Sequence, residues 1–185
     1  MIRFNSVCFS YGKRTVLRDF NLEIPKGERI CLFGESGVGK TTVLRLIMGL
    51  EKANSGCIEG LENKKISAVF QEDRLLPFKT VLENLTLFGT EEKALEFLGE
   101  LGISDAKNLL PEKLSGGMAR RVAIARALML DADIYIFDEI FNGIDDDNVR
   151  KTAELINKTV MGKTVVIVSH NKRDALLLSA KEVLM

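Results

Sequence analysis

The chain has 185 residues, of which 46% are hydrophobic and 28% are charged, and its formal net charge at neutral pH is zero. This composition is typical of a globular protein, and a chain of this length buries about 70% of the surface that its unfolded form exposes. The absence of net charge argues against broad electrostatic attachment to nucleic acid or anionic lipid, so no nucleic-acid partner is expected.

Membrane-spanning and secreted proteins are also disfavoured. No apolar run reaches the length of a transmembrane helix, and the N-terminus lacks the apolar core of a signal peptide. Cys8, Cys31 and Cys57 do not have metal-ligand spacing. An odd number of cysteines inside apolar segments indicates reduced, structural thiols in a cytosolic protein.

The first part of the chain predicts short strands around one glycine-rich loop. The apolar segment "ERICLF" ends at Gly34, and Gly49 closes the helical pattern that follows the loop. We expect strands over residues 2–9, 20–24, 28–33 and 65–70, a helix over 41–50 and a turn-rich segment over 51–56.

The pattern becomes helical between Gln71 and Leu130, and strands return after Asp131. We expect helices over residues 81–88, 91–101, 118–130, 147–160 and 172–180, strands over 133–138 and 163–170, and the start of a strand over 181–185. The layout predicts a single α/β domain, with a core over 1–70 and 131–185 that is interrupted by a helical subdomain over 71–130.

The segment "FGESGVGKTT" fits the P-loop pattern G-x-x-x-x-G-K-[ST], with a predicted strand before it and a helix after it. The glycines allow a tight turn that aims backbone N–H groups at phosphate oxygens, and the helix N-terminus adds partial positive charge. The lysine would neutralise the β- and γ-phosphates, and the first threonine would bind Mg²⁺. The predicted phosphate-binding residues are Gly34, Ser36, Gly37, Gly39, Lys40, Thr41 and Thr42.

Two acidic residues follow the apolar run "IYIF", which predicts a buried parallel strand. Such a strand would end beside the P-loop. Asp138 is then expected to hold Mg²⁺, and Glu139 to polarise the attacking water. The alternative for this pair is an ordinary solvated strand end.

A second helix N-terminus suited to an anion is predicted at "LSGG", where Ser115 is an N-cap and Gly116 and Gly117 leave backbone N–H groups exposed. An ordinary serine cap after a loop is the alternative. One chain offers one γ-phosphate, so a second anion site beside a P-loop suits a nucleotide bound by another chain.

The sequence resembles the ATP-binding-cassette (ABC) ATPases in seven motifs, in the family's order and over nearly the whole chain. "GESGVGKTT" and "IYIFDE" resemble the Walker A and B motifs, and "LSGGM" resembles the signature motif. Gln71 matches the Q-loop, His170 the switch histidine, Tyr11 the aromatic residue that stacks on adenine, and Asp145 the acid of the D-loop.

The resemblance implies a P-loop core with an antiparallel β subdomain and a helical subdomain. It also implies an Mg²⁺-dependent ATPase that forms a head-to-tail dimer around two ATP molecules. Gln71 would contact Mg²⁺ and the attacking water, and His170 would sense the γ-phosphate. Each residue has a structural alternative: Tyr11 as a turn aromatic, Gln71 as a strand cap and the only histidine as a structural residue.

Two departures from the family pattern bear on turnover. Met118 replaces the usual glutamine of the signature motif, and Ile140 replaces the proline that commonly follows the catalytic glutamate. An ATP-gated clamp that dimerises but hydrolyses slowly is therefore the alternative to a transport ATPase. A nucleoside-type kinase is a third possibility, which "LSGGM" disfavours.

The segment "VFQEDRLLPFKTVLENL" resembles the cassettes of nitrate, sulfonate and taurine importers. It implies separate permease subunits, a location on the cytoplasmic face of the membrane through them, and for an importer a solute-binding protein. Leu75, Leu76 and Phe78 would form a groove for the permease, or would pack the subdomain instead.

Overall fold

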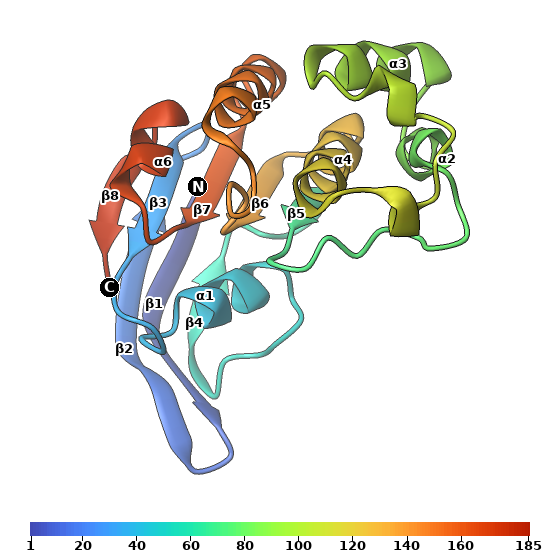
Figure 1. Ribbon diagram of the computed structural model, residues 1–185. Helices are drawn as coiled ribbons and strands as arrows, with labels where there is room; N and C mark the ends of the chain where they lie inside the picture. The colour runs from blue at the N-terminus through green and yellow to red at the C-terminus, as the bar shows by residue number, and fades with distance from the viewer. The chain divides into compact units, whose positions relative to one another are not determined.

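The structure, a computed structural model, describes residues 1–185. Figure 1 traces the chain from the N-terminal hairpin to the C-terminal strand. The strands are β1 (Ile2–Tyr11), β2 (Arg14–Ile24), β3 (Arg29–Phe33), β4 (Ser55–Glu59), β5 (Ile66–Val69), β6 (Ile134–Asp138), β7 (Thr164–Val168) and β8 (Lys181–Leu184). The helices are α1 (Lys40–Ile47), α2 (Val81–Thr86), α3 (Glu91–Glu100), α4 (Gly116–Met129), α5 (Asp146–Thr159) and α6 (Lys172–Leu177), with 3₁₀ turns η1 (Ser104–Ala106) and η2 (Pro111–Lys113).

The order of strands and helices agrees with the sequence prediction except near β4. The segment over 51–56 was expected to be a turn, but Ser55 and Gly56 begin β4. This strand carries no apolar alternation and pairs with β1 through its backbone, so periodicity could not reveal it. Strand β2 also begins earlier than expected, at Arg14.

The first sheet is antiparallel, with strand order β2-β1-β4, as the predicted β subdomain requires. Ile2 pairs with Ile24 and Phe4 with Leu22 across β1 and β2. The buried residues of β1 alternate on each side of an irregularity between Phe4 and Val7, which is the period expected of a strand with one face on a core.

The second sheet has the order β5-β6-β7-β3-β8, and β3 pairs in parallel with both β7 and β8. Every residue of β6 and β7 is buried. Strands buried on both faces are typical of α/β proteins, in which polar residues follow the carboxyl ends of the strands.

The Sγ atoms of Cys8, Cys31 and Cys57 form no disulfide.

Two compact units divide the chain. The first comprises residues 1–66, 132–136 and 162–185, and the second comprises 67–131 and 137–161. The first holds the antiparallel sheet and most of the parallel sheet, with α1 against β7. The single domain with a helical subdomain over 71–130 stays a prediction.

None of the helices combines the length and the apolar character that crossing a bilayer requires.

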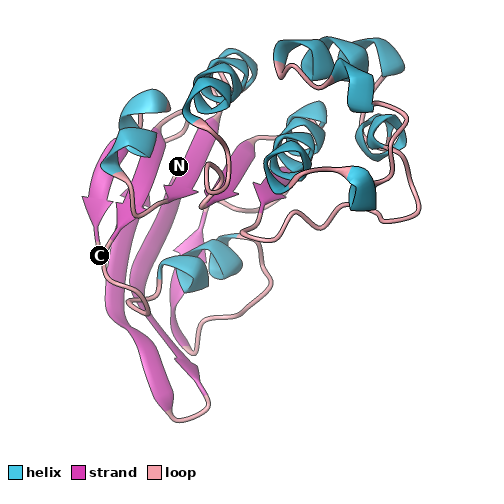
Figure 2. Cartoon of the chain, viewed as in Figure 1, coloured by secondary structure: helices cyan, strands magenta, loops and turns pink.

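The second unit is built from helices α2, α3, α4 and α5, which contact one another (Figure 2). Side-chain oxygens cap their N-termini: Thr80 for α2, Thr90 for α3, Ser115 for α4 and Asp145 for α5. Each cap satisfies a backbone N–H group that the first turn of a helix would leave unpaired.

Asn84, which is fully buried in α2, holds the segment before that helix. Its Oδ1 accepts from the backbone N–H of Leu76 at 2.8 Å and from Arg126 at 3.3 Å. Its Nδ2 donates to the carbonyls of Leu76, Lys79 and Thr80 at 3.0 to 3.2 Å. One amide therefore fixes the loop over residues 76–80.

Replacing this amide tests its contribution. Asn84→Ala leaves buried donors and acceptors unpaired, so we expect a loss of about 2 kcal/mol in the free energy of unfolding, measured in urea. Asn108→Ala, at an exposed position of the same unit, is the control and should change it by less than about 0.5 kcal/mol. Equal stabilities for the two variants would contradict the role of Asn84.

Candidate functional site

The glycine-rich loop lies between the end of β3 at Phe33 and the start of α1 at Lys40. Gly39, the N-cap residue of α1, has φ of 114°, a left-handed conformation that favours glycine. A Cβ added there would lie 2.9 Å from Cδ2 of Leu17. Conformation and space together therefore require glycine at this position.

Lys40 is only 5% exposed, although it is the cation of the loop. Its Nζ donates to the carbonyl oxygens of Gly34 at 2.7 Å and Glu35 at 3.0 Å. An ammonium has three donors, so two bonds to the loop leave one donor for a further acceptor. The side chain thus folds back over the loop, with its charge at the loop's centre.

The remaining loop residues differ in exposure. Ser36, Gly37 and Thr41 are exposed, whereas Thr42 is 6% exposed. A residue that the sequence reasoning missed lies beside them: Nη2 of Arg14 is 3.3 Å from the position that a Cβ on Gly37 would occupy. Only the hairpin between β1 and β2 brings this guanidinium to the loop, so no local motif could reveal it.

Tyr11, at the end of β1, is 40% exposed. Its hydroxyl accepts from Nη1 of Arg45 at 3.3 Å, and its ring meets that of Phe9 edge to face at a centroid distance of 4.8 Å. These contacts fix the orientation of an exposed aromatic ring, as stacking on a planar base requires.

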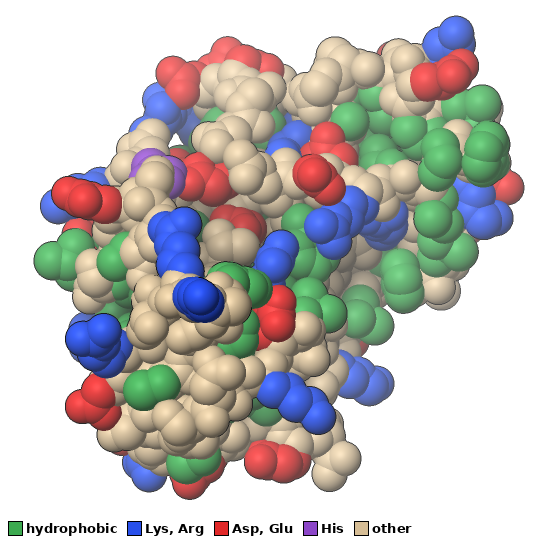
Figure 3. Space-filling view, turned by 90° about the horizontal axis from the view of Figure 1, so that it is seen from below, with side chains coloured by type: hydrophobic (Ala, Val, Ile, Leu, Met, Phe, Trp, Pro, Cys, Tyr) green, Lys and Arg blue, Asp and Glu red, His purple; other side chains and the backbone are tan.

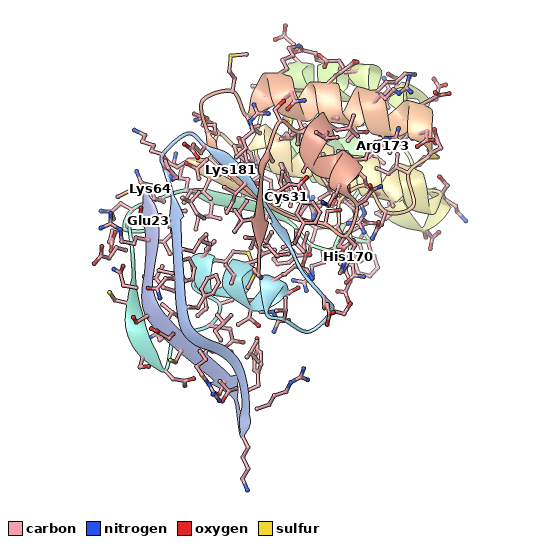
Figure 4. The ribbon with its side chains drawn as sticks, turned by 90° about the vertical axis from the view of Figure 1, so that its left-hand side faces the viewer. Glu23, Cys31, Lys64, His170, Arg173 and Lys181 are labelled. Atoms are coloured by element: carbon pink, nitrogen blue, oxygen red, sulfur yellow. The ribbon has the colours of Figure 1, made fainter.

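His170, the only histidine, is exposed in the connection between β7 and α6 (Figures 3 and 4). Hydrogen bonds around Ser169 shape this connection. The hydroxyl of Ser169 donates to Oδ2 of Asp174 at 2.6 Å and accepts from the backbone N–H of Asn171 at 2.9 Å. The histidine therefore follows a buried strand and precedes a fixed turn.

Asp138 ends β6 and is 7% exposed, whereas Glu139 is half-buried. Glu139 has φ of 54°, a left-handed conformation that non-glycine residues rarely adopt. Its Oε2 accepts from Nδ2 of Asn142 at 2.9 Å. This contact was not predicted from the sequence. The pattern that could have indicated it is the asparagine three residues after Glu139, within a turn.

The predicted N-cap at Ser115 is confirmed, because its hydroxyl accepts from the backbone N–H of Met118 at 3.2 Å. Ser115 and Gly116 are exposed. A Cβ on Gly117 would lie 2.8 Å from the carbonyl oxygen of Gly143, so only glycine allows this approach of two backbones. The N-terminus of α4 therefore contacts the turn that precedes α5.

Asp145 caps α5 and is held by Asn148. The side-chain and backbone N–H groups of Asn148 donate to its carboxylate at 2.7 and 3.1 Å, and they hold the pKa of Asp145 below its usual value. Oδ1 of Asn148 accepts in turn from Nη1 of Arg121, in α4, at 3.1 Å. Asp145 is thus linked to the helix that begins at Ser115.

Gln71 is exposed, and its backbone is held by α4. Arg120 donates to the carbonyl oxygens of Phe70 and Gln71, and its Nε lies 3.1 Å from Oδ1 of Asp73. Burial raises the pKa of Asp73, against the lowering effect of Arg120 and Arg126.

The predicted site residues fall into two sets, one in each compact unit. Tyr11, the glycine-rich loop and His170 belong to the first unit, and the others belong to the second. No group of three or more histidine, cysteine or acidic side chains could hold a metal ion. The expected Mg²⁺ ligands Thr41, Gln71 and Asp138 include one carboxylate only, so they do not form such a group.

Comparisons with known proteins agree with the predicted family. The family model described as "ABC transporter" matches residues 17–142. The chain is 39% identical over 184 residues to the aliphatic sulfonates import ATP-binding protein SsuB 1 of Rhodococcus jostii, covering 95% of this chain and 75% of that protein. It is 36% identical to the arginine transport ATP-binding protein ArtM of Bacillus subtilis, covering 92% and 81%.

A solved structure supports the fold. A dimeric, post-hydrolysis state of the ATP-binding cassette MJ0796, bound to ADP and Pi, has a TM-score of 0.87 and 30% identity, covering 100% of this chain and 94% of that one. The predicted fold class, a P-loop core of the ABC type with an antiparallel β sheet, is therefore confirmed. With this fold, the matching family model and relatives 36% to 39% identical over more than nine-tenths of its length, the chain belongs to the ABC transporter family.

Proposed function

We propose that this chain is the ATP-binding and ATP-hydrolysing subunit of an ABC importer, and that a dimer of it drives solute through separate permease subunits. It is an ABC-type ATPase, and the observation that carries the proposal is Lys40. A buried ammonium that folds over a glycine loop at a helix N-terminus is built for a polyanion such as the triphosphate of ATP.

The groups around this loop suit the rest of the nucleotide. Backbone N–H groups of the segment from Gly34 to Thr42 bind the phosphates, together with Ser36 and the threonines. The ring of Tyr11, fixed by Arg45 and Phe9, stacks on adenine.

The donor types of the three expected ligands suit Mg²⁺ as the partner of ATP. Mg²⁺ prefers oxygen ligands and is usually held by one or two carboxylates together with phosphates and water. Thr41 offers a hydroxyl, Gln71 an amide oxygen and Asp138 a carboxylate at the end of a buried strand. Bound with ATP, the cation neutralises charge on the β- and γ-phosphates.

Hydrolysis depends on three further groups. Glu139 accepts a proton from the attacking water, Gln71 orients that water, and His170 contacts the γ-phosphate. Lys40 stabilises the charge that develops on the phosphate oxygens. This assignment gives each predicted catalytic residue a separate task.

The second anion site supports a head-to-tail dimer. The N-terminus of α4 at Ser115, Gly116 and Gly117 binds the γ-phosphate of a nucleotide held by the partner's loop, and Asp145 follows the turn that contacts Gly117. Two solved relatives of 30% identity are dimeric cassettes.

Exposed apolar residues of the second unit suit a permease. Phe78 is 93% exposed, so packing of the subdomain does not account for it. Leu76, Leu87 and Phe88 are exposed nearby on the loop and α2 end, and hydrophobic side chains gather on one side of Figure 3. A permease docked here would keep the chain on the cytoplasmic face of the membrane.

The solute is not selected by this chain. The names of two relatives specify different solutes, aliphatic sulfonates and arginine, although this chain is 39% and 36% identical to them. Selection therefore lies with the permease and with a solute-binding protein.

Removing the loop cation tests nucleotide binding. We expect Lys40→Ala to abolish measurable Mg-ATP binding in calorimetric titration, because no other ammonium sits within the loop. Lys26→Ala, in the turn before β3, is the control and should bind as the wild type does. Unchanged affinity in Lys40→Ala would refute the phosphate-binding assignment.

Placing a charge on the exposed apolar surface tests whether the permease docks there. The Phe78→Asp variant should keep its basal rate of ATP hydrolysis but should no longer co-purify with the permease. Docking would bury the aspartate in the interface without a group of opposite charge, which is costly. Leu176→Asp, at a 76% exposed position of α6, is the control. Retained binding by Phe78→Asp would place the permease elsewhere.

Glu139→Gln tests the base and the dimer together. It keeps size and hydrogen bonding but removes the base, so with ATP and Mg²⁺ it should stop turnover and accumulate a dimer in light scattering. Adding Ser115→Arg, which fills the anion site, should return it to monomer, whereas Ser104→Arg should not. A Glu139→Gln protein that stays monomeric and hydrolyses at the wild-type rate would refute both assignments.

Phosphate release distinguishes a transport ATPase from the slow ATP-gated clamp. The ATPase should accelerate when reconstituted with its permease and transported solute. A clamp would bind ATP and dimerise, but its rate would stay low and unchanged by the permease.

A further inference from the structure

We propose that Asn142 is a positioning residue for Glu139: its side-chain amide holds the carboxylate in the orientation that hydrolysis needs. The inference rests on the proposed role of Glu139 as the base. It adds a residue to the reaction that does not itself contact the nucleotide.

Two hydrogen bonds join these residues across a four-residue turn. The backbone N–H of Asn142 donates to the carbonyl oxygen of Glu139 at 3.3 Å, and its Nδ2 donates to Oε2 at 2.9 Å. The first closes the turn, and the second fixes the side chain of Glu139 relative to it. A hydrogen bond to a charged acceptor is stronger than one between neutral groups.

The backbone conformation of Glu139 supports a role for this contact. Its φ of 54° is costly for a residue with a Cβ, and such conformations cluster at functional sites. The next residue is isoleucine, which restricts the backbone of Glu139 less than a proline would. A glutamate side chain has three rotatable bonds, so the contact with Asn142 reduces the number of orientations open to its carboxylate.

The turn itself is anchored at several points, which makes Asn142 a fixed reference. Ile140 and Phe141 are 2% and 7% exposed, so they tie the turn to the core. The carbonyl oxygen of Gly143 lies against Gly117, where a Cβ would be 2.8 Å away. Asp145 then begins α5 as its N-cap.

The chemistry of an amide suits this task. An asparagine amide does not titrate and offers N–H donors, so it binds a carboxylate without competing for the proton that the base must accept. The bond to one oxygen restrains the position of the carboxylate. The carboxylate is then preorganised before water attacks, which lowers the cost of reaching the transition state.

Kinetics of the full-length chain test the proposal. In Asn142→Ala the donor is lost, and we expect kcat for ATP hydrolysis to fall about three- to tenfold with KM for ATP unchanged. Asn142→Asp should lower kcat further, because a carboxylate repels that of Glu139. Asn142 is exposed, so neither change should shift the thermal midpoint, and Asn108→Ala and Asn108→Asp are the matched controls.

A double-mutant cycle shows whether Asn142 acts through Glu139. Glu139→Asp shortens the side chain and withdraws the carboxylate from the amide. Adding Asn142→Ala to it should therefore have no further effect on phosphate release, measured in a single turnover from labelled ATP. An equal loss in both backgrounds would overturn the proposal.

The remaining outcomes separate this proposal from the one that it rests on. If Glu139→Gln is inactive while Asn142→Ala keeps the wild-type kcat, the base assignment stands and the positioning role is wrong. If Asn142→Ala raises KM with kcat unchanged, the residue acts in binding and the proposal is overturned. If Glu139→Gln retains the wild-type rate, the base assignment fails, and the positioning role fails with it.

Discussion

Two hydrogen bonds, from Nζ of Lys40 to the carbonyl oxygens of Gly34 and Glu35, are the contacts on which the glycine-rich loop depends. Lys40 is 5% exposed, and a buried ammonium needs acceptors, which two carbonyl oxygens of the loop supply for two of its three donors. In the same loop Gly39 has a left-handed conformation, and α1 begins directly at the lysine. The shape of the loop, the first residue of α1 and the position of the charge are therefore linked through Lys40.

The burial of the parallel strands decides where the remaining chemistry lies. Every residue of β6 and β7 is buried, so polar side chains are excluded from their middles and appear where the strands end. Asp138 is the last residue of β6, and His170 follows β7 by two residues. The same constraint is the physical reason for expecting candidate site residues at the ends of short apolar runs.

Continuous apolar runs and fixed spacings were predictable, whereas contacts made by backbone turns were not. β3, β6 and β7 were recognised because each contains a run of four consecutive apolar residues, and the helices because of their periodicity and caps. Strand β4 was missed because its exposed residues carry no pattern. Arg14 and Asn142 were missed because turns of the backbone create their contacts. The hairpin between β1 and β2 brings Arg14 to Gly37, and the turn that begins at the left-handed Glu139 brings Asn142 to its carboxylate.

The arginines of α4 show how one helix organises the second unit. Arg120 and Arg121 are 7% and 8% exposed, and burying them requires acceptors. They find these in backbone carbonyls: Arg120 at Phe70 and Gln71, and Arg121 at Gly117 and Leu101.

Farther along the same helix, Arg126 binds the carbonyls of Asp73 and Arg74. These carbonyl contacts tie the segment after β5 to the helix, and the ion pair between Arg120 and Asp73 adds a further tie. The helix that presents Ser115 to solvent thus also sets the backbone on which Gln71 sits. An anion bound at its N-terminus would act on an element already tied to that segment, and rigid ties of this kind are what two distant groups need in order to move together.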